Sequence, residues 1–337
     1  MTAIDFSTIY AKINGVKFLI IRFSSIGDIV LSTSLVRCLK KKFPESRIDF
    51  ALKEQYAEIL SGNPNISNLI LYNNDFFSFI RKIRSENYDY IIDIHGNFRS
   101  FITAMFSSGR LLKVKNYLFE RFMLVEFGLD FYRGNISVAE RYIDAVKPLG
   151  VENDGLGPEI FINSDVKNSM NLPSGNYAGI CPVSVWNTKR WPPENFIELS
   201  KKIISESGCG ILIFGGPRDR GYCEKIKTAI GSGAVNLCGI SIQETAYYLK
   251  MCRFLVSNDT GIMHVACALK VPVIALFGPT AGEFGFYPPP SAGKVISKDY
   301  QCKPCSTKGC NKCPVGSFSC MKDIRAGEVF SNCAAYL

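Results

Sequence analysis

A turn in the carboxy-terminal half of the chain has the residue types of a phosphate site, because SNDTGIMH follows the apolar run 254–256. The pattern predicts a buried parallel strand and then a helix, whose free backbone N–H groups attract phosphate. Gly261 permits close backbone approach, Thr260 adds a hydroxyl donor, and Asp259 can accept hydrogen bonds from sugar hydroxyls. His264 lies one helical turn beyond Thr260. The alternative is a capped helix packed on a sheet, with His264 as a buried structural histidine.

A second turn of this kind carries the carboxylate of Asp28. The apolar residues 17–23 (KFLIIRF) predict a buried strand, and SSIGD then leads into a helix predicted over residues 29–42. This glycine-containing turn before a helix start is again suited to phosphate. Helix capping is the alternative role for Asp28, because acidic residues are common in first helical turns.

A basic loop follows a third predicted strand, at residues 177–182. It reads VSVWNTKRWP, and a helix is predicted to start near Pro193, since proline suits the first helical turn. Lys189 belongs to a basic pair between two tryptophans, and its compact positive charge suits a diphosphate. The alternative is a solvated turn in which Trp191 packs on the sheet.

Polar residues also follow the predicted strand 88–94, in the sequence HGNFRS. Ligands gather at the carboxyl ends of parallel strands, so we expect His95, Asn97 and Arg99 to line the acceptor side of a cleft. A turn that merely caps the next helix through Ser100 is the alternative.

The elements that position these residues alternate between strand and helix in each half of the chain, which predicts two doubly wound parallel sheets. A turn-rich stretch at 149–176, with one further strand candidate at 159–162, separates the halves. The predicted strands are 17–23, 47–52, 68–72 and 88–94, then 177–182, 210–214, 254–256 and 273–277; the predicted helices include 29–42, 76–86, 222–230 and 242–251.

Composition sets limits on function. The chain has 337 residues, 47% of them apolar, which is enough for two domains. It has no apolar run of the ~18 residues that span a bilayer and begins without a signal peptide, so we expect a cytoplasmic protein. The net charge of +9 favours anionic partners, but no nucleic-acid-binding motif accompanies it, and we expect no nucleic acid.

Basic and aromatic residues are concentrated between residues 110 and 141. They predict a surface for a phosphorylated lipid or for the plane of an anionic membrane. The alternative is a solvated helical face over ordinary core aromatics.

Five of the thirteen cysteines lie in CKPCSTKGCNKCPVGSFSC, at residues 302–320. Two Cys-x-x-Cys pairs are typical of metal sites, and four thiolates could hold a structural zinc ion. An iron–sulfur cluster, disulfide-forming cysteines and reduced structural thiols are the alternatives. The metal-ligand candidates are Cys302, Cys305, Cys310, Cys313 and Cys320.

Motifs of other enzyme classes are missing from the sequence. No GxGxxG opens a helix after a strand, and there is no GxxxxGK[ST], HExxH or GxSxG. An Asp-x-Asp pair that would hold a divalent ion on a nucleotide diphosphate is also missing. If the donor is a nucleotide sugar, protein groups must therefore stabilise the leaving diphosphate, and we expect no metal in catalysis.

Three segments resemble the signature sequences of glycosyltransferase family nine, the ADP-heptose:lipopolysaccharide heptosyltransferases. They are SSIGDIVLSTSLVRCLKKKFP, PVSVWNTKRWPPENF and SNDTGIMHVACALKVPVIALFGPT. The resemblance implies the GT-B fold, in which two Rossmann-like α/β domains face each other across a cleft. Members of the family often carry a cysteine-rich tail of the type seen here.

The resemblance also implies roles for single residues. Asp28 occupies the place of the proposed general base, and Lys189, with Ser184 five positions before it, occupies the donor loop. Asp219 is the candidate for ribose binding, although many members have Glu there and helix capping is its alternative role. Some members have a second hydroxyl residue where this chain has Val185, so one polar contact is absent. The expected donor-binding residues are Ser184, Lys189, Asp219, Asp259, Thr260, Gly261 and His264.

The expected organisation is an acceptor-binding domain at 1–165, a donor-binding domain at 166–320, and a C-terminal helix at 321–337 that packs back on the first domain. The expected reaction is inverting, metal-independent transfer of heptose from ADP-L-glycero-D-manno-heptose to the lipid A–Kdo inner core of lipopolysaccharide, at the cytoplasmic face of the inner membrane. A different donor sugar, a GT-B-like nucleotide-sugar epimerase and a non-catalytic nucleotide-sugar-binding protein are the alternatives.

Overall fold

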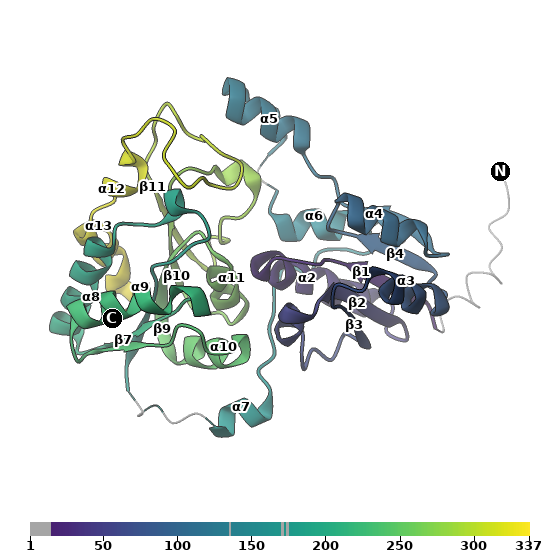
Figure 1. Ribbon diagram of the computed structural model, residues 1–337, viewed down its shortest axis with the longest axis horizontal. Coiled ribbons are helices and arrows are strands. Elements are labelled where there is room, and N and C mark those ends of the chain that lie inside the picture. The colour runs from purple at the N-terminus through teal and green to yellow at the C-terminus, as the bar shows by residue number, and fades with distance from the viewer. Residues whose placement is uncertain (1–14, 135, 170–171, 173–174) are drawn as a thin grey trace. The chain divides into compact units, whose positions relative to one another are not determined.

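The chain forms two compact units, each built on one parallel sheet (Figure 1). The computed structural model describes residues 15–134, 136–169, 172 and 175–337. The first unit takes the chain up to residue 116 together with 138–161, and the second takes 117–137 together with 162–337. The two sheets confirm the predicted pair of α/β domains.

In the first unit the sheet has the strand order β3-β2-β1-β4-β5, and every pairing is parallel. The chain adds β2 and β3 on one side of β1, then returns to add β4 and β5 on the other. The strand order therefore reverses between β1 and β4. The elements are β1 (Lys17–Ile21), α2 (Ile26–Lys42), β2 (Arg47–Lys53), the 3₁₀ turn η1 (Glu54–Ile59), β3 (Asn68–Tyr72), α3 (Phe76–Ser85), β4 (Tyr90–Asp93), α4 (Phe98–Met105), β5 (Arg110–Lys113), α6 (Val138–Asp144) and η2 (Lys147–Leu149).

In the second unit the order is β11-β10-β9-β6-β7-β8, also parallel throughout, and it reverses between β6 and β9. The elements are α5 (Leu118–Phe127), α7 (Ser164–Ser169), β6 (Tyr177–Cys181), η3 (Asn187–Lys189), α8 (Pro193–Ser207), β7 (Gly210–Ile213), η4 (Pro217–Asp219), α9 (Arg220–Ile230), β8 (Ala234–Asn236), α10 (Ile242–Met251), β9 (Cys252–Asn258), α11 (Gly261–Ala268), β10 (Val273–Phe277), η5 (Gly282–Phe284), β11 (Gly293–Ser297), α12 (Ser319–Lys322), α13 (Ala326–Cys333) and η6 (Ala334–Tyr336).

Local sequence explains these elements. Central strands such as β1 and β10 are apolar, apart from Lys17 at the start of β1, because helices cover both faces of a parallel sheet, and all of β10 is buried. Helix α8 begins with Pro193 at a first-turn position and ends at Gly208, whose φ of 68° gives the left-handed helix cap. Most predicted strands and helices are confirmed to within a few residues.

The strand predicted at 159–162 is wrong, because these residues have no regular secondary structure. The backbone N–H of Glu159 donates to the hydroxyl of Thr33 at 2.9 Å, and its carboxylate binds Arg37 at 3.0 Å. This segment is therefore held by hydrogen bonds to side chains of α2 and not by pairing with a neighbouring strand. Helix α7 follows in a stretch for which only turns were expected.

Two segments of the predicted domain organisation can be located in the structure. Residues 117–137, expected in the first domain, pack with the second unit, where Leu124 of α5 joins a small core with Ala281 and Phe284. Helix α13 contacts α8 and β10 of its own unit, and its expected packing on the first domain stays a prediction. In the described part of the chain, no helix is both long and apolar enough to span a bilayer.

Candidate functional site

Most of the predicted site residues lie at two points where strand order reverses. In an open parallel sheet, ligands bind outside the carboxyl ends of the strands at such a point. In the first unit, Asp28 follows β1 and His95 follows β4. In the second, Lys189 follows β6 and Asp259 follows β9. The fold therefore supplies one candidate site in each unit.

The carboxylate of Asp28 accepts hydrogen bonds on both oxygens. Its Oδ2 accepts from the hydroxyl of Ser25 at 2.8 Å and pairs with the guanidinium of Arg22 at 2.7 Å. Its Oδ1 accepts from the hydroxyl of Tyr142 at 3.1 Å. Asp28 also closes a capping box with Ser25 at the start of α2, so capping is one of its roles.

Arg22 controls the charge of this carboxylate. Burial raises the pKa of Asp28, but the charge of Arg22 and hydrogen bonds from Ser25 and Arg22 outweigh it, so the pKa lies below its usual value. Arg22 is held in turn by the carbonyl of Ile94 at 2.7 Å. Sequence reasoning missed Arg22 and Tyr142, since no pattern relates residue 142 to residue 28.

The HGN turn after β4 is built around buried Asp93. The Asp93 carboxylate accepts from the backbone N–H groups of His95 at 3.0 Å and Gly96 at 2.9 Å. Burial, with the nearby charge of Arg22, lowers the pKa of His95 to about 4, so its imidazole is neutral at neutral pH. Its Nδ1 atom is buried without a hydrogen-bond partner among the described residues.

The three acceptor-side candidates therefore differ in their surroundings. Asn97 caps α4 by accepting from the N–H of Ser100 at 2.9 Å, so this turn does cap the helix, but with Asn97 and not, as the alternative had it, Ser100 as the N-cap residue. Arg99 is exposed, with its guanidinium 5.1 Å from the centre of the Tyr72 ring. Of the three, His95 has the most suitable position to meet a ligand at the end of β4.

The donor candidates of the second unit meet at Asp259. Its Oδ2 pairs with the ammonium of Lys189 at 2.5 Å and accepts from the hydroxyl of Thr280 at 3.3 Å. The hydroxyl of Ser184 donates to the carbonyl of Asp259 at 3.1 Å. Side chains from two other loops thus converge on Asp259, and Thr280 is a member that sequence reasoning missed.

Helix α11 begins at this same point. Thr260 is its N-cap residue in extended conformation, but its side chain makes no capping bond, and Gly261 is the first helical residue. His264 is buried, with its ring 6.2 Å from that of Phe286. The hydroxyl of Thr260 is therefore not committed to the helix end, whose N–H groups favour an anion.

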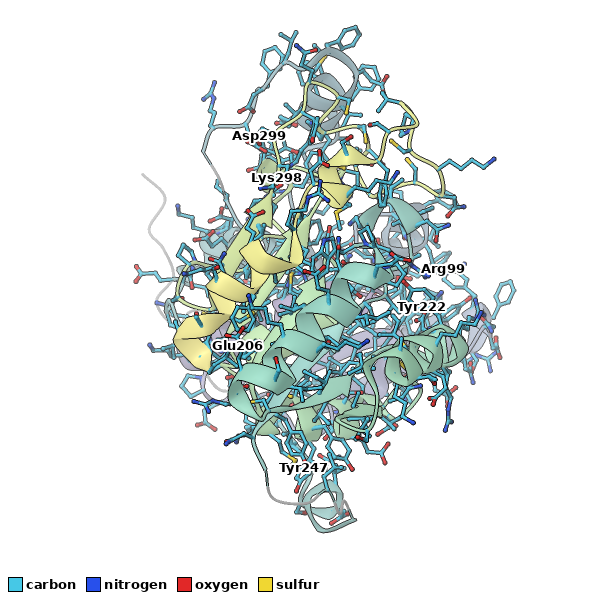
Figure 2. The ribbon with its side chains drawn as sticks, turned by 90° about the vertical axis from the view of Figure 1, so that its left-hand side faces the viewer. Arg99, Glu206, Tyr222, Tyr247, Lys298 and Asp299 are labelled. Carbon is cyan, nitrogen blue, oxygen red and sulfur yellow. The ribbon has the colours of Figure 1, made fainter. Side chains whose placement is uncertain are left out.

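Asp219 lies in the next turn along the sheet. Its Oδ2 accepts from the N–H of Gly216 at 3.2 Å, which holds the turn after β7. Asp219 is the N-cap residue of α9, but its side chain makes no capping bond to that helix. Its Oδ1 lies 3.5 Å from the guanidinium of Arg190. Arg190 also donates to the carbonyl of Ser184 at 2.8 Å, and its guanidinium lies 5.6 Å from the centre of the Tyr222 ring of α9. Tyr222 is labelled in Figure 2. Sequence reasoning passed over Arg190 in favour of its neighbour, Lys189.

The cysteine-rich segment supports the Lys189 loop. The backbone N–H and hydroxyl of Thr188 donate to the carbonyl of Cys310 at 3.0 and 2.9 Å, and the N–H of Cys310 donates back to that hydroxyl at 2.8 Å. The N–H of Cys305 donates to the carbonyl of Pro279, beside Thr280. Across the described ranges, no three Cys, His, Asp or Glu side chains are arranged to hold a metal ion.

Comparison with known proteins identifies relatives along most of the chain. The family model described as "Glycosyltransferase family 9 (heptosyltransferase)" matches residues 76–315. Lipopolysaccharide heptosyltransferase 2 of Escherichia coli (strain K12) is 27% identical over 303 residues, which are 80% of this chain and 84% of the relative.

Two solved structures share the fold. The structure of E. coli ADP-heptose lps heptosyltransferase II has a TM-score of 0.74 at 23% identity, over 95% of this chain and 98% of the other. E. coli heptosyltransferase WaaC with ADP-2-deoxy-2-fluoro heptose has a TM-score of 0.72 at 20% identity, over 96% of this chain and 100% of the other. These matches confirm the predicted GT-B fold class.

Proposed function

This chain belongs to glycosyltransferase family 9 and is a glycosyltransferase, and from that premise we propose that it transfers heptose from ADP-L-glycero-D-manno-heptose to inner-core lipopolysaccharide. Its relatives are named lipopolysaccharide heptosyltransferases, and one structural neighbour was solved with an ADP-heptose analogue. The observation that carries the proposal is the set of residues at the two reversal points: a buried carboxylate after β1, and a lysine beside a helix N-terminus after β6 and β9.

Asp28 is the proposed general base. Its carboxylate takes the proton of an acceptor hydroxyl while that oxygen attacks the anomeric carbon of the heptose. The bond from this carbon to the diphosphate oxygen breaks as the new bond forms, so ADP leaves and the anomeric configuration inverts. Arg22 and Tyr142 hold the carboxylate in place, and the low pKa of Asp28 keeps it ionised before the reaction.

We propose that Lys189 and the N-terminus of α11 stabilise the negative charge that grows on the leaving diphosphate. In this proposal the ammonium of Lys189 turns from Asp259 to the diphosphate, and Asp259 then accepts from the heptose hydroxyls. Ser184, Thr260, Gly261 and His264 complete the donor site, and Asp219 binds the ribose. No metal takes part, since the positive charge comes from protein groups.

The decisive experiment measures ADP release by the purified protein supplied with ADP-heptose, with and without lipid A–Kdo acceptor. Release that depends on acceptor, and a product one heptose heavier, support transfer. Binding of ADP-heptose without product would instead support a non-catalytic binding protein. Asp28→Asn is the control: it should lower kcat by about 10²–10⁴-fold without loss of folding, as for removal of a general base.

Two further parts of the proposal concern the cysteines and location. We propose that the enzyme needs no cofactor for catalysis. The five cysteines could hold structural zinc only after rearranging, because in the described ranges they are not arranged to hold a metal ion. Metal analysis of protein purified without chelator tests this, and a content well below one equivalent would remove the zinc hypothesis. We also place the enzyme at the cytoplasmic face of the inner membrane, where its lipid acceptor would be found.

A further inference from the structure

Exposed apolar side chains are concentrated in one stretch of the chain. Of the sixteen large apolar side chains exposed among the described residues, ten lie between residues 98 and 131. Single exposed apolar residues are ordinary, but a concentration of large ones marks an interaction site. The ten are Phe98, Phe101, Met105, Phe106, Leu118, Phe119, Phe122, Phe127, Leu129 and Phe131.

In the first unit these side chains form a stripe on α4. Phe98, Phe101 and Met105 follow the spacing of one helical face, and they are 78%, 40% and 67% exposed. The opposite face, with Ser100 and Thr103, is buried. The apolar stripe of α4 therefore faces away from the core of its unit, which is the reverse of an ordinary amphipathic helix.

In the second unit α5 also exposes large apolar side chains. Leu124 packs against Ala281 and Phe284, while Phe119 and Phe122 on the other side are 62% and 54% exposed. Exposed rings pair with one another: Phe119 with Phe131 at 5.7 Å and Phe122 with Phe127 at 5.8 Å. The helix thus presents a cluster of aromatic rings rather than a polar face.

The charges around the apolar side chains of the first unit are positive. Residues 95–119 contain four basic side chains and no acidic one: Arg99, Arg110, Lys113 and Lys115. The ammonium of exposed Lys113 lies 4.5 Å from the centre of the exposed Phe101 ring, so basic and apolar groups share one surface. Glu120, Glu126 and Asp130 accompany the more apolar α5.

We propose that residues 98–133 dock the protein on an anionic lipid surface, with the apolar face of α4 and that of α5 as the inserting parts. Exposed aromatic and aliphatic side chains enter the boundary between headgroups and acyl chains, while lysine and arginine pair with lipid phosphates. The inference deepens the proposed function, because a transferase whose acceptor is a membrane lipid must work at that lipid's surface.

Flotation with vesicles tests the docking surface without donor or turnover. The protein should float with vesicles of phosphatidylethanolamine and phosphatidylglycerol, much less with phosphatidylcholine alone, and less as salt is raised. Phe98→Ser/Met105→Ser and Phe119→Ser/Phe122→Ser should each weaken binding by about tenfold or more, given the burial free energy of such side chains. The matched control is Phe77→Ser, on α3 and 84% exposed, which should float like the wild type.

The electrostatic part has its own variant. Arg110→Glu/Lys113→Glu should weaken binding to anionic vesicles about tenfold or more and reduce its salt dependence. Lys201→Glu/Lys225→Glu, on exposed positions of α8 and α9, makes the same charge change outside the stretch and should have little effect. Circular dichroism melting checks that every variant is folded.

Three results would overturn the inference: no flotation of the wild type, equal flotation of the stretch variants and their controls, or a dimer in sedimentation that the serine variants abolish. The last would assign the surface to a second copy of the chain. Turnover on a deacylated acceptor in free solution distinguishes a failure of the docking proposal from a failure of the proposed heptose transfer. The serine variants should keep wild-type turnover there, and a wild type inactive on that acceptor and on lipid A–Kdo would count against transfer, not docking.

Discussion

At the scale of single residues, the proposed chemistry depends on charges that neighbours adjust. Asp28 is ionised because Arg22 lies against it, and Lys189 is held ready by Asp259. Both pairs join residues from different loops or elements, and both are largely buried, so each partner strongly affects the other. Two predictions follow from these pairs.

Replacing Arg22 by Gln should change the pH profile of the reaction. The positive charge lowers the pKa of Asp28 against the effect of burial, so its loss raises that pKa. A carboxylate base loses activity as the pH falls through its pKa, so the acid limb of kcat/KM should move to higher pH. Arg22→Lys keeps the charge and should keep the limb near its original place. An acid limb that does not move in Arg22→Gln would mean that Asp28 is not the titrating base.

Replacing Lys189 by Met should lower kcat about 10²–10³-fold, the range expected when a preorganised group that stabilises a leaving anion is lost. If Lys189 only neutralises Asp259, the loss of activity in Lys189→Met would come from the unpaired charge of Asp259, and removing that charge would restore activity. The double variant Lys189→Met/Asp259→Asn distinguishes them in steady-state kinetics. Recovery of activity in the double variant would contradict a direct role of Lys189 at the diphosphate.

At the scale of elements, the cysteine-rich segment braces the donor loop. Its residue Gly309 has a φ of 102°, and a Cβ added there would lie 2.7 Å from Cβ of Trp186, one turn before Lys189. The segment and the loop are thus packed too closely for any side chain at 309. This contact gives the segment a structural role in the site whether or not its cysteines bind metal.

Gly309→Ala should therefore push the segment from the loop and raise the KM for the donor several-fold. Gly316→Ala is the matched control, because φ is also positive there, at 76°, but a Cβ would meet nothing within 4 Å. Backbone strain alone should cost each variant about 1 kcal/mol of stability. Steady-state kinetics at varied donor concentration and urea unfolding compare the two, and equal KM values in both variants would argue against the brace.

At the scale of the whole molecule, an ion-pair network ties the connection that follows the first sheet to helix α2. Arg37 binds Asp154 through two hydrogen bonds of 2.8 Å, Glu159 at 3.0 Å and the carbonyl of Gly157 at 2.7 Å. The hydrogen bond from Arg37 lowers the pKa of Asp154 to about 2. The chain just before the second unit is therefore fixed by one arginine.

Arg37→Met should lower the free energy of unfolding by about 3 kcal/mol, since it leaves carboxylates partly buried and unpaired. The pKa of Asp154 is lower in the folded state than the ~3.9 of an unfolded chain, so its contribution is full above about pH 4 and is lost as pH falls toward about 2. The difference in free energy of unfolding between wild type and Arg37→Met, measured by urea unfolding, should thus be constant near neutral pH and become smaller in acid. Arg81→Met, on the exposed surface of α3, is the control, and a difference independent of pH would disprove the linkage.

The sequence alone was enough to predict the two parallel sheets, most of their strands, and the turns that carry Asp28, Lys189 and Asp259. These features depend on apolar periodicity and on short polar turns, which act within a few residues. The strand predicted at 159–162 failed for the converse reason: its apolar residues suit a strand, but the tertiary structure offers it the side chains of Thr33 and Arg37 instead of a strand edge.

What only the tertiary structure decided is which groups control the candidate site. Tyr142 reaches Asp28 across 114 residues, Lys189 pairs with Asp259 across 70, and Thr188 pairs with Cys310 across 122. The order of strands brings these residues together, and a single sequence contains no local signal for such contacts. The residues that can do chemistry were therefore readable in the chain, whereas the neighbours that set their charge and position depend on the packed fold.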